Sequence, residues 1–293
     1  MSKQKTVSLV LGSGGARGLS HIGIIKWLEE HDYHIESISG CSIGALIGGI
    51  YAAGKLDDFE QWSRSITKMD ILTLLDLSWN RSGLVKGDKL INTLTELVGD
   101  LKIEDLPIKY TAVASDIANE KEVWLNSGKL FDAIRASISL PFFFTPFSYN
   151  GRELMDGGIL NPIPVAPTFC DGTDLTIAVN LVGKVLETKR TPVVTDLDNA
   201  LGSPISDKVA GFVNRFKGSP EEPIGKDVGV FEIANQAFDA MQNTIFRHKQ
   251  ATYPADYLIE IPRNACGMLE FNRASEMIDL GYNSMCESLG SAT

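Results

Sequence analysis

The stretch TVSLVLGSGGARG, residues 6–18, decides the class of fold. Its first part, Thr6–Leu11, is a short apolar run of the kind that forms a buried strand. Its second part, Gly12–Gly18, is a glycine-rich loop, and Leu19–Glu30 behind it has apolar residues at helical spacing. A strand that leads through a loop into a helix is typical of the repeating unit of an α/β fold.

The same pattern follows at once a second time. Glu36–Ser39 is predicted to be a short strand, and Ser42–Gly54, rich in glycine and alanine, a helix. Strands joined in this way run parallel, with right-handed crossovers. We therefore expect an α/β three-layer sandwich, in which a central, mostly parallel sheet carries helices on both faces.

Further strands and helices are expected along the rest of the chain. Strands are predicted at Tyr110–Ala114, Glu122–Leu125, Phe147–Tyr149, Glu153–Met155, Leu175–Val179 and Asp256–Ile261, and helices after Asp88, from Ser127 to about Leu140, and at Val230–Ala251 and Asn272–Leu289. Asp88 and Ser127 are expected to cap their helices, and Pro141 to end the second of them. Asn150-Gly151 is expected to form the two-residue turn of a hairpin.

Length and composition are those of an ordinary globular protein. The chain has 293 residues, of which 44% are hydrophobic and 22% charged, which excludes a disordered or low-complexity chain. We expect one domain over residues 1–293. Residues 184–229 are polar and punctuated by proline and glycine, and we interpret them as a mobile excursion that could act as a lid.

Charge and cysteine content exclude several classes of partner. The net charge of −10 disfavours nucleic acid and anionic membranes, so at most transient contact with a membrane surface is expected. The apolar runs Val7–Leu11 and Ile43–Gly54 are far shorter than the ~20 residues that span a bilayer. The four cysteines are widely spaced, without a C-x-x-C pair, which indicates a reduced, cytoplasmic protein with no metal and no cofactor.

The glycine loop is the first candidate site. It exposes backbone N–H groups in front of a helix and could hold an anion. It is neither a dinucleotide-binding fingerprint, because Arg17 stands where a glycine is needed, nor a P-loop, because Gly18-Leu19-Ser20 lacks the lysine. The alternative is that its glycines serve only a tight turn and close packing.

The second candidate is Gly40-Cys41-Ser42-Ile43-Gly44, again between a strand and a helix. In this context G-x-S-x-G forms a sharp turn that exposes the serine oxygen. If the two strands are parallel neighbours, both loops emerge at the same edge of the sheet. The amides of Gly14 and Gly15 would then point at a carbonyl group that Ser42 attacks.

A nucleophilic serine needs a base, and the four histidines do not supply one. His21 is expected to support the glycine loop, and His31, His34 and His248 have no catalytic context. The alternative is Asp156, which with Gly157 and Gly158 follows the hairpin. Asp-Gly-Gly forms either a plain turn or a carboxylate that turns back toward a neighbouring strand end.

Together these motifs resemble those of the patatin-like phospholipase family, in particular its compact bacterial cytosolic members. The resemblance covers roughly Thr6–Val179. It is carried by the glycine block (Gly12, Gly14, Gly15, Arg17, Gly18), the nucleophile elbow (Gly40, Ser42, Gly44), the Asp-Gly-Gly element (Asp156, Gly157, Gly158) and the stretch from Arg135-Ala136-Ser137 to Pro146 that precedes it.

The resemblance implies a Ser-Asp dyad in place of a triad. Ser42 would attack a lipid ester, Asp156 would act as the base, and Gly14 and Gly15 would form the oxyanion hole. Arg17 would either bind a substrate phosphate or brace its loop. The phenylalanines at 142, 143, 144 and 147 would be either core or the wall of an acyl-chain pocket.

The expected function is therefore a serine acylhydrolase that acts on phospholipids, lysophospholipids or related acyl esters and contributes to lipid degradation. Two alternatives remain open at this point. One is a carboxylesterase or thioesterase that uses the same residues. The other is a non-catalytic regulatory protein that keeps the fold and binds a protein partner.

Overall fold

The computed structural model describes residues 4–74, 85–141, 143–185 and 230–290. By its contacts the chain divides into two units, Met1–Leu186 with Gln242–Thr293, and Glu187–Met241. The sheet and both candidate loops belong to the first unit. The excursion predicted at 184–229 lies, from residue 186 on, outside the described residues, so its role as a lid stays a prediction.

The described strands form one sheet of eight, in the order β5-β6-β3-β2-β1-β7-β8, with β4 paired to β3 off this path. Their bounds are β1 Lys5–Leu11, β2 Tyr33–Cys41, β3 Lys109–Asp116, β4 Lys121–Leu125, β5 Phe147–Tyr149, β6 Arg152–Asp156, β7 Leu175–Gly183 and β8 Tyr257–Pro262. The strands from β3 to β8 along this order run parallel, and β4, β5 and β6 pair antiparallel. The expected mostly parallel sheet is confirmed.

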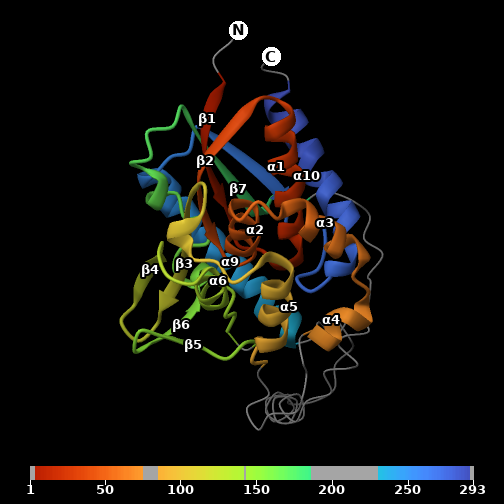
Figure 1. The fold of residues 1–293 in the computed structure, drawn as a ribbon, viewed down its shortest axis with the longest axis vertical. Coiled ribbons are helices and arrows are strands. Elements are labelled where there is room, and N and C mark those ends of the chain that lie inside the picture. The colour runs from red at the N-terminus through yellow and green to blue at the C-terminus, as the bar shows by residue number, and fades with distance from the viewer. Residues whose placement is uncertain (1–3, 75–84, 142, 186–229, 291–293) are drawn as a thin grey trace, which may run out of the picture. The chain divides into compact units, whose positions relative to one another are not determined.

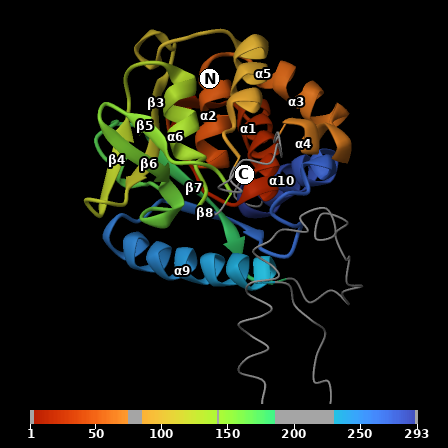
Figure 2. The same ribbon diagram turned by 90° about the horizontal axis from the view of Figure 1, so that it is seen from below.

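Helices cover the sheet, as the ribbon in Figure 1 shows. Their bounds are α1 Ser20–Glu30, α2 Ile43–Ala52, α3 Leu56–Ser65, α4 Lys68–Leu74, α5 Asp88–Val98, α6 Leu130–Ser137, α9 Val230–Thr252 and α10 Ala274–Leu289. In Figure 2 β7 and β8 lie between the part of α9 that belongs to the first unit, from Gln242 on, and the group of helices that includes α1 and α2. The sequence pattern did not predict α3 and α4.

Strand β1 shows why the sheet needs helices on both faces. Neighbouring residues of a strand point to opposite faces. Leu9 and Leu11 belong to the main core, which includes residues of α1 and α2, whereas Val10 belongs to a second cluster with Ala178 of β7 and Phe246 of α9. Burial on both faces explains why the run is apolar throughout instead of alternating.

The hairpin β5–β6 has the turn that its sequence predicts. Tyr149 pairs with Arg152, and the two residues between them have left-handed backbone angles, with φ of 50° at Asn150 and 76° at Gly151. Two successive residues with positive φ define the turn type that Asn-Gly favours in hairpins.

Both predicted helix caps are wrong. Asp88 is the first residue of α5, and the cap position is Gly87, which has a φ of 74° and where a Cβ atom would lie only 3.0 Å from the side chains of Arg135 and Phe144. Ser127 lies before Gly128, whose φ of 91° turns the chain, so that α6 starts at Leu130. Helix α6 also ends at Ser137, earlier than expected.

Candidate active site

Strand β3 brings the candidate nucleophile and the candidate base together. It pairs with β2 as far as Cys41 opposite Val113, and then with β6 from Asp156 opposite Ala114. Because Val113 and Ala114 are consecutive, the ends of β2 and β6 meet beside β3. Ser42, which follows Cys41, therefore lies next to Asp156.

The two side chains are hydrogen bonded. The Oγ of Ser42 donates to Oδ2 of Asp156 at 2.5 Å. Ser42 is half-buried, whereas Asp156 is fully buried. The serine oxygen is thus open to a substrate on one side, and its partner is shielded from bulk water.

Ser42 has a backbone conformation that non-glycine residues rarely adopt. Its φ is 56° and its ψ −123°, and such a conformation costs of order 1–3 kcal/mol. Hydrogen bonds hold it in place, because the Ser42 N–H donates to Oγ of Ser137 at 2.9 Å and that hydroxyl donates to the Val113 carbonyl at 2.7 Å. With this backbone conformation the side chain of Ser42 points out of the strand, toward Asp156.

The glycines of the elbow sit where the chain leaves no space. A Cβ atom on Gly40 would lie 2.5 Å from the Gly44 carbonyl oxygen. One on Gly44 would lie 2.1 Å from the carbonyl oxygen of Leu11, at the end of β1. Helix α2 therefore starts in direct contact with the strand that carries the glycine loop.

Burial dominates the electrostatics of Asp156. It raises the pKa of this carboxyl group from 3.8 to about 6, and hydrogen bonds from Ser42, Gly158 and Cys41 offset part of the rise. The Gly158 N–H donates to Oδ1 at 2.7 Å, and the Cys41 thiol lies 3.9 Å from the same oxygen. Asp156 is therefore ionised near neutral pH and more basic than an exposed aspartate.

Two amides of the glycine loop have no acceptor in the described part of the chain. The flanking amides are used, because Ser13 N–H donates to the Pro162 carbonyl at 2.9 Å and Ala16 N–H to the Met268 carbonyl at 2.8 Å. Within the described residues, the N–H groups of Gly14 and Gly15 meet no such partner. Gly14 is the N-cap and Gly15 the first residue of a short 3₁₀ helix, where no preceding turn supplies a carbonyl.

The loop is braced from within. Arg17 is buried, its Nε donates to the Gly14 carbonyl at 3.0 Å, and its Nη1 donates to the Arg263 carbonyl at 3.0 Å. These contacts match the loop-bracing interpretation rather than a phosphate ligand. His21 donates through Nε2 to the Gly12 carbonyl at 3.0 Å, and burial lowers its pKa to about 4, so it is neutral at pH 7.

The other candidates lie elsewhere. His31 stacks on Trp27, and His34 and His248 are exposed; none of the described hydrogen bonds joins a histidine to Ser42. Phe143 and Phe144 pack in a small cluster with Ile71 and Val85. Position 142 lies outside the described residues, and a role for this cluster in holding an acyl chain stays a prediction.

Neither a metal site nor a membrane-spanning helix is found among the described residues. No three His, Cys, Asp or Glu side chains in that part of the chain gather closely enough to hold a metal ion. None of the described helices is both long and apolar enough to cross a membrane.

Comparison with known proteins identifies the class. A family model for patatin-like phospholipases matches residues 9–169, which include the glycine loop, the elbow and Asp156. The chain belongs to the patatin-like phospholipase family. It is therefore a hydrolase of the phospholipase and esterase class, which cleaves lipid esters.

Individual relatives match the chain beyond residues 9–169. An NTE family protein of Mycobacterium tuberculosis is 39% identical, over 96% of this chain and 90% of its own length. Lysophospholipase NTE1 of Kluyveromyces lactis is 31% identical over 95% of this chain, which corresponds to only 19% of that protein. VipD of Legionella pneumophila covers 98% of this chain and 67% of its own at 16% identity, with a TM-score of 0.47.

Sequence reasoning missed two residues of the site. Ser137 holds the amide of Ser42; it lies in a stretch that resembles the family, but nothing in its spacing pointed to the elbow. Gln242 lies on α9, 229 residues from the loop it contacts, and no motif marks it.

Proposed function

We propose that this protein is a serine acylhydrolase that cleaves the acyl esters of phospholipids or lysophospholipids, with Ser42 as nucleophile and Asp156 as base. The observation that carries the proposal is the 2.5 Å hydrogen bond from a half-buried serine to a fully buried carboxylate whose pKa is raised to about 6. A base with a pKa near the working pH combines ionisation with basicity.

The first half-reaction would form an acyl-enzyme. Asp156 Oδ2 takes the proton of Ser42 as Oγ bonds to the carbonyl carbon of the ester. The negative charge that develops on the carbonyl oxygen is stabilised by the amides of Gly14 and Gly15. As the tetrahedral intermediate collapses, the bond to the leaving alcohol breaks, and the alcohol takes the proton back from Asp156.

The second half-reaction would release the fatty acid. Asp156 removes a proton from a water molecule, whose oxygen attacks the carbonyl carbon of the Ser42 ester. The bond to Oγ then breaks, and Asp156 returns the proton to Ser42. One carboxylate thus serves both steps without a histidine.

Two features support lipid esters with a phosphate-bearing head group. The family is that of patatin-like phospholipases, and a relative of 31% identity is called a lysophospholipase. The substrate would be presented by a micelle or a membrane surface that the enzyme contacts only transiently, in keeping with a net charge of −10.

Labelling with a fluorophosphonate probe tests the nucleophile. We expect the wild type to be labelled and Ser42→Ala to remain unlabelled. Asp156→Asn should fold and lose ester hydrolysis by roughly 10²- to 10⁴-fold, the usual contribution of a general base. Wild-type turnover in Asp156→Asn would contradict the dyad.

A substrate panel tests the substrate class. We expect phospholipids or lysophospholipids to be cleaved with higher kcat/KM than acyl thioesters and short nitrophenyl esters of matched chain length. Preference for the thioester or the short ester would point to a thioesterase or carboxylesterase. An unlabelled Ser42 together with no hydrolysis would favour a non-catalytic binding protein.

A further inference from the structure

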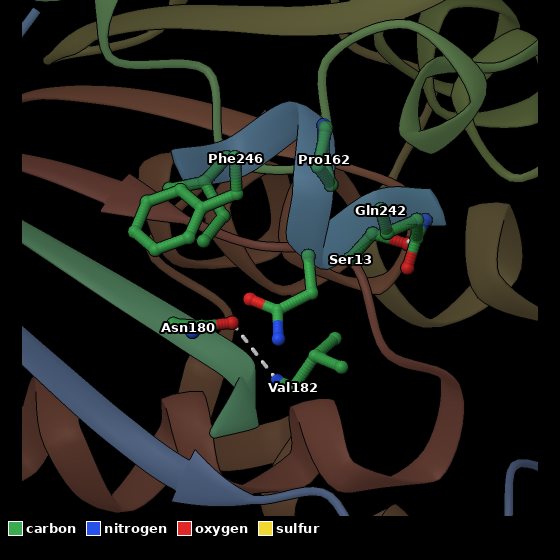
Figure 3. Close-up of a pocket in the computed structure, with 8 residues that line it drawn as sticks. Ser13, Pro162, Asn180, Val182, Gln242 and Phe246 are labelled. Carbon is green, nitrogen blue, oxygen red and sulfur yellow. Dashed lines mark hydrogen bonds between the residues drawn. The ribbon is translucent and has the colours of Figure 1, made fainter. Parts of the chain in front are cut away.

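Helix α9 contributes a side chain to a small pocket beside the two candidate loops. Ser13 of the glycine loop, Pro162 from the segment after Asp-Gly-Gly, Asn180 of β7 and Gln242 of α9 are among the residues that line it (Figure 3). The side-chain oxygen of Asn180 already has a partner, since Oδ1 accepts a hydrogen bond from the N–H of Val182 at 2.9 Å. The polar group that links the pocket to the site is Gln242.

The amide of Gln242 touches both loops at once. The side chain is buried, and its Nε2 lies 3.2 Å from Oγ of Ser13 and 3.2 Å from the carbonyl oxygen of Gly158. Ser13 precedes Gly14, whose amide is a candidate oxyanion donor. The amide of Gly158 itself donates to Oδ1 of Asp156. A single NH₂ group therefore joins the oxyanion loop to the loop of the base.

The packing at this junction leaves little freedom. A Cβ atom on Gly158 would lie 2.2 Å from Nε2 of Gln242, 2.9 Å from Oγ of Ser13 and 3.0 Å from Oδ1 of Asp156. Three polar groups from three separate segments thus surround the position that a Cβ atom of residue 158 would take. A displacement of Gln242 would shift Ser13 and Gly158 in turn.

We propose that Gln242 is a positioning residue that holds the oxyanion amides in register with Asp156. The inference rests on the proposed function and adds to it a residue outside the matched segment 9–169. Donors stabilise an oxyanion only within a narrow range of distances, and a misplacement of about 1 Å costs roughly 10²-fold in rate. None of the described hydrogen bonds of Gln242 involves Ser42, so its effect would be indirect.

The test is Gln242→Met, which keeps the length and approximate volume of the side chain and removes the donor. Gln250→Met is the matched control, because Gln250 lies on the same helix and no described hydrogen bond links it to either loop. We expect kcat to fall about 10- to 100-fold in Gln242→Met with KM changed less than about threefold. The melting temperatures of the two variants should be similar.

A double-mutant cycle separates positioning from general loosening. In Ser13→Ala one of the two acceptors of Gln242 is lost, so its effect on kcat should be smaller in the Gln242→Met background than in the wild type. Additive effects would mean that the pair does not act together and would overturn the inference. The cycle stays informative if Gln242→Met is less stable, provided that kcat is normalised to the fraction labelled by a fluorophosphonate.

The outcomes distinguish this inference from the proposed function. If Gln242→Met retains kcat within twofold of Gln250→Met while Ser42→Ala is inactive, Gln242 has no positioning role and the dyad stands. If the wild type is neither labelled nor active on lipid esters, the proposed function fails first. A rise in KM with unchanged kcat would assign Gln242 to substrate binding and would also overturn the inference.

Discussion

The burial of Asp156 has opposite effects on the proposed chemistry and on the stability of the fold. Its full burial makes it a stronger base than an exposed aspartate, and the same burial makes its charged form costly to the fold. Hydrogen bonds from Ser42, Gly158 and Cys41 offset part of this cost.

The activity should follow the ionisation of Asp156. Because burial raises the pKa of this group to about 6, kcat/KM should rise between pH 5 and pH 7 with an apparent pKa near 6 and level off above it. A water-soluble ester, followed over this pH range, makes the measurement possible without changes in lipid aggregation. A profile that is flat down to pH 4.5 would contradict the assignment of the base.

Asp156→Asn should stabilise the fold at neutral pH. In the unfolded chain the pKa of Asp156 is near 3.8, and in the folded protein it is about 6. Below pH 4 both states hold the proton, and above pH 6 the folded state must bury the charge, so about 3 kcal/mol of stability is lost as the pH rises through this window. Asparagine carries no charge at any pH.

The free energy of unfolding of Asp156→Asn, relative to the wild type, should therefore increase between pH 4 and pH 7. Chemical denaturation at the two pH values gives the comparison. Asp116→Asn is a control, because its pKa is lowered in the fold, mainly by Asn119, so its charge changes stability only at and below about pH 4 and its substitution should give a difference that is nearly constant between pH 4 and pH 7. A pH-independent difference for Asp156→Asn would contradict the burial of a charge.

At the scale of the elements, the site depends on how closely α2 approaches β1. The contact is between backbones, since Gly44 has no side chain and lies against the carbonyl groups of Leu11 and Gly12. The serine can be presented at the edge of the sheet only because the helix starts immediately behind it. The two glycines of the elbow are thus needed for packing as well as for the turn.

Gly44→Ala should lower the free energy of unfolding more than Gly151→Ala does. At Gly44 a Cβ atom would lie 2.1 Å from the Leu11 oxygen, whereas at Gly151 the space is open and only its φ of 76° opposes a side chain. We expect a loss of about 3 kcal/mol or more at Gly44 and of about 1–2 kcal/mol at Gly151. Equal losses, measured by denaturant unfolding, would contradict the close approach.

At the scale of the whole molecule, the sequence predicted the architecture well where local patterns are strong. The order of strands and helices from Thr6 to Ala52, the Asn150-Gly151 hairpin and the family all followed from short stretches. The strand predicted at Glu36–Ser39 is longer in the structure, Tyr33–Cys41. Its first residues are not an apolar run, but they pair with β1 and so extend the strand.

What the sequence could not predict depends on contacts between distant segments. The starts of α5 and α6 are determined by Gly87 and Gly128, which have positive φ angles. Helix propensities do not predict which glycine adopts such an angle. Helices α3 and α4 are short and carry many charged residues, which weakens their apolar pattern. The role of Gln242 arises only when α9 reaches the glycine loop, far away along the chain.

Removal of metal ions tests the chemistry of the whole molecule. In the proposed mechanism the base is Asp156 and the charge on the substrate oxygen is met by backbone amides. We expect a chelator in excess to leave ester hydrolysis within about twofold, because each function has a protein group assigned to it. A loss that calcium or another divalent ion restores would require a ligand set that the described residues do not show.

Because β2 and β6 pair with consecutive residues of β3, the candidate site should tolerate insertions in some segments and not in others. Ser42 and Asp156 of the proposed dyad are aligned by the pairing of Val113 and Ala114 with two different strands, so this alignment does not depend on the length of the connecting segments. An insertion of one residue into β3 between these positions would instead part the serine and the carboxylate by about 3.3 Å, one residue of rise. Gaps between homologues should therefore collect outside this strand and spare its middle.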